Sequence, residues 1–178
     1  MRACPWVFLG LVGVLILGSA GRPGASPAST LCHPDEQIVF NCTVKDGKLV
    51  SLCSSPQLTR HHGVLQYRFG RAGAVELQFP PLHEATPARF RYTHYFRAHV
   101  DRTTVRFTHN GYTYTLFEDS EGETTPVVQQ QGVEVNRPGQ EATTQTFLCR
   151  GTVVRKLSTL EALVPCDQDD PLNMGNCP

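Results

Sequence analysis

Apolar residues in this chain recur at every second position, and the alternation stops at short turn sequences, a pattern typical of β-hairpins. In the clearest case, segments 104–109 and 112–117 flank Asn110-Gly111. Asn-Gly favours a type I′ turn, because both residues tolerate a positive φ. Alternation then separates the side chains of this hairpin into an apolar face (Val105, Phe107, Tyr112, Tyr114 and Leu116) and a polar face (Arg106, Thr108, Thr113 and Thr115).

Two further hairpins are predicted upstream. Segments 37–44 and 48–53 flank Asp46-Gly47, and segments 64–69 and 74–79 flank a three-residue loop at 71–73. In the first hairpin, one face is expected to carry Phe40, Cys42, Val44, Leu49, Ser51 and Cys53. In the second, one face is expected to carry Leu65, Tyr67, Phe69, Val75, Leu77 and Phe79, with Arg68 opposite Glu76 on the other.

The remaining elements complete a mostly β chain. Segments 89–97, 125–135 and 143–150 are predicted strands, and Gly132 is expected to break the second. One helix is predicted over 159–164, with Ser158 and Glu161 as a capping box and Pro165 as its end. The expected fold is a small antiparallel sandwich or barrel built from hairpins, with one short C-terminal helix and a disulfide-pinned tail.

The N-terminal segment has the layout of a secretory signal peptide. Residues 7–18 are apolar, and Gly18-Ser19-Ala20 supplies small residues for cleavage after Ala20 or a little later. The apolar run is shorter than the roughly 20 residues that span a bilayer. We therefore expect a signal peptide at 1–20, a flexible spacer at 21–31 and a single β-rich domain at 32–178. The mature chain is expected to be periplasmic or secreted, with no integral membrane segment.

Cysteine usage agrees with export. Cys4 lies in the predicted signal, and six cysteines follow it: Cys32, Cys42, Cys53, Cys149, Cys166 and Cys177. An even number in an exported chain indicates disulfides. Cys42 and Cys53 share a face of the first predicted hairpin, so we expect them to bond. Cys166 and Cys177 are each expected to bond, with each other as one option. Elimination then pairs Cys32 with Cys149.

No catalytic, metal or cofactor site is predicted. The formal net charge of zero argues against a nucleic-acid partner. His61 and His62 would point to opposite faces of a strand, and His94 and His99 are five residues apart, so neither pair has the spacing of a shared metal ion. Residues 118–123 (EDSEGE) are expected to form a solvated hairpin tip.

Arginines form the one surface pattern that suggests binding. Along 89–97 the aromatic residues and His94 fall at one parity, and Arg89, Arg91 and Arg97 fall at the other. Arg102 and Arg106 continue the basic face on the next strand. Five guanidinium groups on one sheet face could bind an anionic protein or glycan of the envelope through bidentate hydrogen bonds. The alternative is an ordinary solvated face, balanced by residues 118–123 and by the acidic C-terminal segment.

Several strings resemble a set of uncharacterised exported proteins of Gram-negative bacteria. They are VSLC (50–53), LQYRFG (65–70), NGYTY (110–114), VPCD (164–167) and LNMGNC (172–177). The resemblance implies a periplasmic or secreted location and brings no known activity. The chain is also faintly similar to periplasmic lysozyme inhibitors of the small β-barrel type, through a GYTYTL hairpin (111–116) followed by a strand that ends in cysteine. It has no clear counterpart of their Ser-Gly inhibitory loop.

Together these patterns predict an exported, disulfide-stabilised binding module that is not an enzyme and whose ligand is unknown. An inhibitor of a cell-wall hydrolase such as lysozyme is one alternative. A structural envelope protein is the other.

Overall fold

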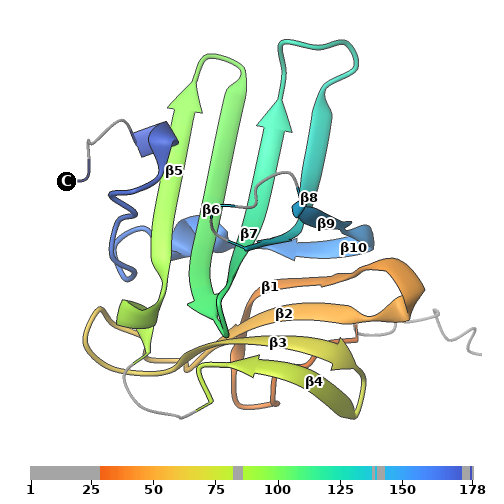
Figure 1. Cartoon of the computed structure of the whole chain (residues 1–178), viewed down its shortest axis with the longest axis vertical. Helices are drawn as coiled ribbons and strands as arrows, with labels where there is room; N and C mark the ends of the chain where they lie inside the picture. Colours follow the sequence, from red (N-terminus) through yellow and green to blue (C-terminus); the bar gives the residue numbers. More distant parts are fainter. Residues whose placement is uncertain (1–28, 82–85, 138, 140–142, 174–176, 178) are drawn as a thin grey trace, which may run out of the picture.

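The computed structural model describes residues 29–81, 86–137, 139, 143–173 and 177. The predicted signal peptide and residues 21–28 of the predicted spacer lie outside this part. The described residues form ten strands in two antiparallel sheets of five strands each (Figure 1). The strands are β1 Gln37–Thr43, β2 Leu49–Ser54, β3 Leu65–Arg71, β4 Ala74–Phe79, β5 Arg91–Arg97, β6 Val100–His109, β7 Tyr112–Glu121, β8 Val128–Asn136, β9 Gln145–Leu148 and β10 Arg150–Arg155.

The two sheets pack face to face, which confirms the predicted mostly β fold. Sheet A has the order β10-β1-β2-β3-β4, and sheet B has the order β5-β6-β7-β8-β9. Neither sheet closes on itself, so the barrel form of the prediction is wrong. The upper halves of β5–β8 extend beyond sheet A (Figure 1).

Aromatic rings from both sheets fill the centre of the core. Phe107 of β6 stacks on Tyr114 of β7, with ring centroids 4.9 Å apart, and on Phe79 of β4, at 4.5 Å. Tyr67 of β3 and Phe90 complete the cluster at 5.0 and 5.5 Å from Phe107. Burial of such large rings is the dominant favourable contribution to folding.

The β6–β7 hairpin agrees with its prediction. His109 pairs with Tyr112 across Asn110-Gly111, whose φ values are 51° and 74°. Both values lie in the left-handed region that a type I′ turn needs. Val105 and Phe107 therefore face the core, as the alternation predicts.

The β1–β2 hairpin has a register one residue away from the predicted one. Val44 N donates to Lys48 O, so the loop is the three-residue turn Lys45–Gly47 and not Asp46-Gly47 alone. Cys42 consequently pairs with Val50. A shift of one residue moves every side chain of a strand to the other face. Cys53 therefore points away from the core and from Cys42.

The β3–β4 hairpin keeps its predicted inner face but not its loop. Arg71 pairs with Ala74, and a bulge at Gly70 absorbs the extra residue. Gly70 has φ +151°, and a Cβ at this position would lie 2.4 Å from Ala74 O, so the bulge requires glycine. The bulge leaves Val75 47% exposed and places Arg68 opposite Gln78, not opposite Glu76.

The hairpin register also decides the disulfides. The bonds are Cys32–Cys53, Cys42–Cys149 and Cys166–Cys177. The predicted Cys42–Cys53 and Cys32–Cys149 bonds are thus wrong, while mutual pairing of Cys166 and Cys177 is confirmed. Cys42 lies on the core side of β1 and bonds to Cys149, between β9 and β10. Cys53 lies on the outer side of sheet A and bonds to Cys32.

Three C-terminal elements differ from their predictions. β8 runs unbroken through Gly132, because a Cβ there would lie 2.4 Å from Phe147 O and glycine lets β9 approach. The predicted strand 143–150 ends at Leu148, and β10 follows it into sheet A. The predicted helix is a 3₁₀ turn, η4 Leu157–Leu160, without a side-chain cap. Burial of Leu157 and Leu160, three residues apart, suits 3₁₀ geometry, and Pro165 leaves too few residues for a stable α-helix.

The N-terminal segment packs on the outer face of sheet A through a buried arginine. Arg68 is 1% exposed, and its guanidinium donates to both carboxylate oxygens of Glu36, at 2.5 and 2.8 Å, and to Leu31 O at 2.9 Å. Partial burial alone would raise the pKa of Glu36. Hydrogen bonds from Arg68 and from His33 N oppose this effect and hold the pKa of Glu36 below its usual value. Ser29 O, three residues before the predicted start of the domain, accepts a hydrogen bond from Asn41 Nδ2.

Mapping of the disulfides tests the register of the first hairpin. Trypsin alone does not cut between Cys32 and Cys42, whereas trypsin with a glutamate-specific protease separates every cysteine except Cys166 and Cys177. In unreduced digests we expect the peptide ending at Glu36 linked to 49–60, peptide 37–45 linked to 142–150, and 162–178 closed on itself. A link between 37–45 and 49–60 would contradict the register.

Removal of the buried guanidinium should be costly. Arg68→Met is expected to lower the free energy of unfolding by about 3 kcal/mol, because the partly buried carboxylate of Glu36 loses its partner. The control is Lys48→Met, which removes the exposed Lys48–Glu76 pair and should cost no more than about 1 kcal/mol. Urea unfolding measures both. Equal losses for the two variants would show that the Arg68–Glu36 pair has no special role.

Candidate functional site

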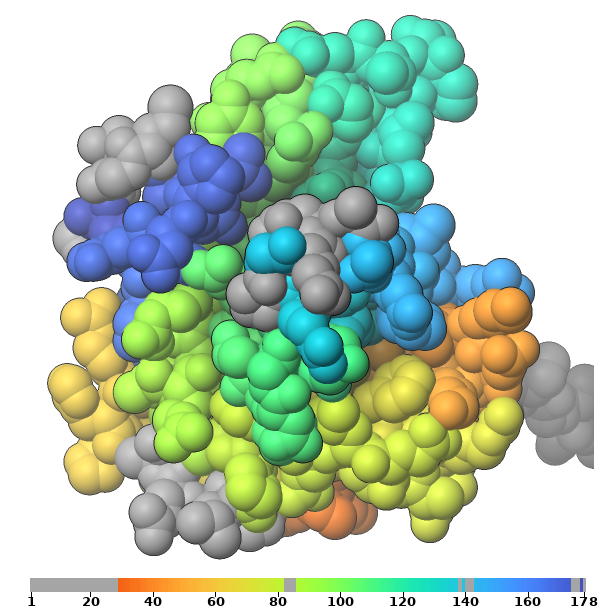
Figure 2. Space-filling model, viewed as in Figure 1, coloured from red at the N-terminus to blue at the C-terminus, as the bar shows by residue number. Residues whose placement is uncertain are grey.

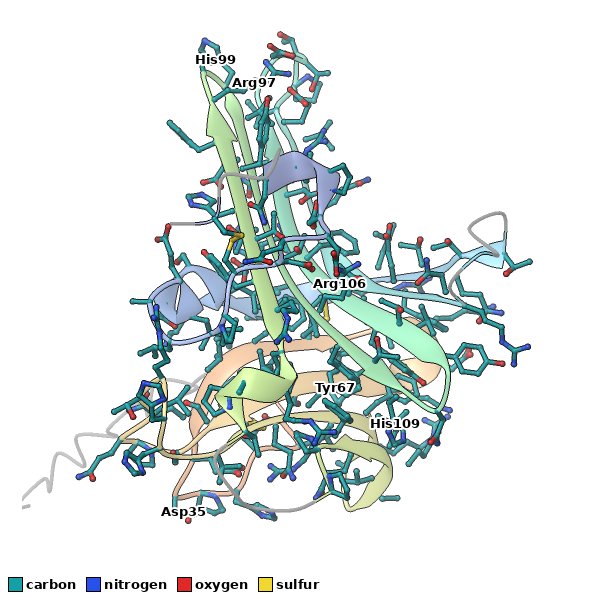
Figure 3. All side chains as sticks on the ribbon, turned by 60° about the vertical axis from the view of Figure 1, so that its left-hand side comes forward. Asp35, Tyr67, Arg97, His99, Arg106 and His109 are labelled. Carbon is teal, nitrogen blue, oxygen red and sulfur yellow. A yellow bond between two sulfur atoms is a disulfide. The ribbon has the colours of Figure 1, made fainter. Side chains whose placement is uncertain are left out.

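Four of the five predicted arginines share the outer face of sheet B. Arg91 pairs with Arg106, and Tyr95 pairs with Arg102, across β5 and β6. Arg97 continues this face at the tip of the β5–β6 hairpin, while Arg106 lies half-way down the sheet (Figure 3). The fifth, Arg89, lies before the strand, in the 3₁₀ turn η2 Pro87–Arg89.

The C-terminal segment crosses this outer face and divides it. Cys166 forms a parallel bridge with Tyr92, and Asp167 N donates to Tyr92 O at 2.8 Å. Thr93 Oγ1 donates to Asp170 Oδ2 at 2.9 Å, just before the turn η5 Pro171–Asn173. Figure 2 shows the segment, in dark blue, between the upper part of β5–β6 and the residues around η2. The outer face is therefore not one continuous basic surface.

Three of the arginines have carboxylate partners within the chain. Arg106 Nη2 donates to Asp167 Oδ1 at 2.6 Å, and Asp167 is 1% exposed. Arg97 forms a bidentate pair with Glu123, which raises the pKa of the guanidinium and lowers the pKa of the carboxyl. Arg102 lies 3.6 Å from a carboxylate oxygen of Glu121. The chain itself thus neutralises most of the predicted basic face.

Arg89 and Arg91 differ, because no carboxylate within the described ranges pairs with them. The Arg89 guanidinium lies 5.9 Å from the centre of the Phe79 ring. Arg91 donates to Ala88 O and to Phe90 O through the same nitrogen, Nη1. These bonds fix the orientation of the guanidinium, while its Nε and Nη2 make no hydrogen bond to the described residues. Two oriented cations therefore remain at the lower end of the outer face.

Both arginines line an open pocket of about 480 Å³, here called the arginine pocket. Its lining residues are Phe79, Ala88, Arg89, Arg91, Arg106, Phe107, Thr108, Thr113 and Asp169. The paired threonines add hydroxyl groups, and the two phenyl rings add an apolar wall. With Arg106 neutralised by Asp167, two arginines stand against the single carboxylate of Asp169. The pocket therefore carries a net positive charge suited to an anionic group.

The inner face of sheet B carries a carboxyl group that the sequence analysis assigned to a solvated loop. Glu118 lies within β7, not in a hairpin tip, and its Oε1 accepts a hydrogen bond from Leu157 N at 3.2 Å. Burial raises the pKa of Glu118 to about 7, against the opposing effects of this hydrogen bond and of nearby Arg155. Glu118 has the parity of Leu116, but the alternation does not reveal that η4 covers this part of the face.

One geometric cluster resembles a metal site but is not one. Cys32, Glu36 and Cys53 have ligand atoms within 4.8 Å of one another. Both cysteines belong to the same disulfide, so their sulfur atoms are not available as thiolates.

The carboxyl group of Glu118 should titrate near neutrality. A raised native pKa means that the folded chain holds this proton more tightly than the unfolded chain. The stability of the wild type should therefore fall, relative to Glu118→Gln, as pH rises from about 4.5 to about 7. Urea unfolding across this range, together with NMR titration of the Glu118 side-chain carbon, measures the effect. A titration midpoint near 4.5 would contradict it.

Comparisons with known proteins do not add a relative. No family model, no curated protein and no solved structure matches the chain. Within the described residues, no helix is long and apolar enough to cross a membrane. The function must therefore be argued from the geometry of the chain itself.

Proposed function

We propose that the protein is an exported, non-catalytic binding module that recognises an anionic group of an envelope protein or glycan in the arginine pocket. The observation that carries this proposal is the difference among the arginines. Arg97, Arg102 and Arg106 have carboxylate partners. Arg89 and Arg91 form no ion pair with the described residues, and they line an open pocket.

The fixed orientation of Arg91 supports ligand binding. A guanidinium held by two backbone carbonyls loses little side-chain entropy when an anion arrives. Its free N–H groups match the spacing of two oxygens in a carboxylate, sulfate or phosphate group. Thr108 and Thr113, opposite each other on β6 and β7, supply neutral hydrogen bonds beside the cations.

Three disulfides support the exported location of this proposal. Bonds of this kind persist in oxidising compartments and are rare in the cytosol. Cys32–Cys53 ties the N-terminal segment to β2, Cys42–Cys149 ties the β9–β10 corner to β1, and Cys166–Cys177 closes a loop within the C-terminal segment. A periplasmic or secreted location follows as part of the proposal.

Two anionic polymers test the pocket. We expect affinity electrophoresis to show retardation by polygalacturonate, by dextran sulfate or by both, and none by neutral dextran. The variant Arg89→Gln/Arg91→Gln should bind about tenfold more weakly or worse, since a charged hydrogen bond is worth roughly 1.5–3 kcal/mol and 1.4 kcal/mol is tenfold. Retardation should also decline as salt rises from about 0.1 to 1 M.

The matched control is Arg97→Gln/Arg102→Gln, which removes the same formal charge from the other end of the outer face. It should change binding by less than about threefold, because screening limits charge effects to about 10 Å at 0.1 M salt. Equal weakening by the two double variants would indicate non-specific charge attraction. That result, or no retardation by either anionic polymer, would overturn the proposal.

A further inference from the structure

The inner face of sheet B continues beyond the core as a polar surface. The row Tyr92, Val105, Leu116 and Val133 is buried against sheet A. The next two rows toward the projecting end are His94, Thr103, Glu118 and Gln131, and then Phe96, Asp101, Ser120 and Gln129. All three rows lie on one side of the sheet, because each row is two residues further along its strands and side chains two residues apart point to the same face.

The end of β10 and η4 form a wall opposite these rows. Arg155 Nη1 donates to Gln129 Oε1 at 3.1 Å, and Leu157 N donates to Glu118 Oε1. Glu161, just after η4, lies 3.8 Å from the imidazole of His94. The space between the rows and this wall is a cleft of about 290 Å³, here called the inner cleft. It is lined by His94, Asp101, Thr103, Glu118, Asp119, Ser120, Gln131, Arg155 and Ser158.

The lining of the inner cleft is rich in directional hydrogen-bonding groups. Thr103, Ser120 and Ser158 offer hydroxyls, and Gln131 offers an amide with two donors and one acceptor oxygen. His94 Nε2 lies 3.0 Å from Asp101 Oδ1, which orients the imidazole and the carboxylate. Groups of this kind can both donate and accept, as the hydroxyls of a sugar require.

An exposed aromatic ring stands at the rim. Phe96 is 71% exposed, the largest value among the bulky apolar residues described, and its ring centre lies 6.5 Å from that of His94. Because the Phe96 ring is not buried in the core, it contributes little to the stability of the fold. A flat ring beside polar groups suits the apolar face of a pyranose, whose C–H groups stack on it while the hydroxyls reach the polar lining.

From these contacts we infer that the inner cleft binds a neutral saccharide, with Phe96 as its stacking platform. Asp101, Glu118 and Asp119 line the cleft with a single arginine, and Glu161 lies beside His94, so an anionic ligand is disfavoured. A metal ion is disfavoured as well, since the only group of three close ligand atoms in the described residues lies elsewhere, at Cys32. This site is on the opposite face of sheet B from the arginine pocket and does not depend on it.

Defined oligosaccharides test the inference. The probes are maltohexaose, cellohexaose, xylohexaose and the hexamer of N-acetylglucosamine, each titrated calorimetrically into the full mature chain. Binding of at least one is expected. Phe96→Ala should weaken that binding by about tenfold and Gln131→Ala by about three- to tenfold, as expected for loss of one stacking or hydrogen-bonding contact. The melting temperature of Phe96→Ala should be close to that of the wild type, because the ring that is removed is exposed.

Two controls make the test specific. Tyr112→Ala removes an exposed ring from the opposite end of sheet B and should leave saccharide binding unchanged. Arg89→Gln/Arg91→Gln should also leave it unchanged, so that failure of the arginine pocket and failure of the inner cleft are separable. The inference is overturned if none of the four saccharides binds, or if Phe96→Ala and Gln131→Ala bind them as well as the wild type.

Discussion

The Cys42–Cys149 disulfide is the constraint on which the arrangement of the two sheets depends. It joins the core side of β1, inside sheet A, to the single residue between β9 of sheet B and β10 of sheet A. Cys149 N also donates to Gln131 O, so the corner is fixed to β8. Because the cysteines are 107 positions apart, this bond removes much conformational freedom from the unfolded chain, on the order of 4–5 kcal/mol in the chain-entropy account.

Both candidate binding sites include residues from the chain that follows this corner, Asp169 in the arginine pocket and Arg155 and Ser158 in the inner cleft. Because Cys149 directs the chain into sheet A, β10 pairs with β1 and carries Arg155 to the edge of the inner cleft. η4 then packs against β6 and β7, and the C-terminal segment crosses the outer face of sheet B, where Asp167 meets Arg106. A different cysteine pairing would place neither the wall of the cleft nor the acidic segment where they are.

The acidic C-terminal segment acts on the outer face as an internal counterion. Its carboxylates satisfy Arg106 and the hydroxyl of Thr93. Glu123, in the loop after β7, pairs with Arg97, and Glu121, at the end of β7, pairs with Arg102. Exposed ion pairs such as Arg97–Glu123 and Arg102–Glu121 contribute little to stability. The effect of the three pairs is on the pattern of charge, because among the five predicted arginines they leave only Arg89 and Arg91 without a carboxylate partner in the described residues. The two faces of sheet B thus differ in chemistry. The outer face is positive at the arginine pocket, and the inner face is acidic at the inner cleft and rich in hydroxyl and amide groups.

The sequence by itself determined the local structure wherever a turn sequence and the alternation agree. Asn110-Gly111 set the register of β6–β7, because the dipeptide favours a type I′ turn. Alternation along β6 placed Arg102 and Arg106 on the same face. The mostly β class followed from the same alternation. The parity of Arg91 and Arg97 was likewise predictable from the sequence.

Tertiary structure alone decided the contacts between distant segments. The turn Lys45–Gly47 allows more than one loop length, and the shift of one residue that separates Cys42 from Cys53 depends on packing against the core. Which arginines have partners depends on carboxylates far along the chain, as with Arg106 and Asp167, 61 residues apart. The burial of Glu118 depends on η4, which approaches β7 only after the chain has changed sheets. Alternation reports the face of a strand on which a residue lies, but not what covers that face.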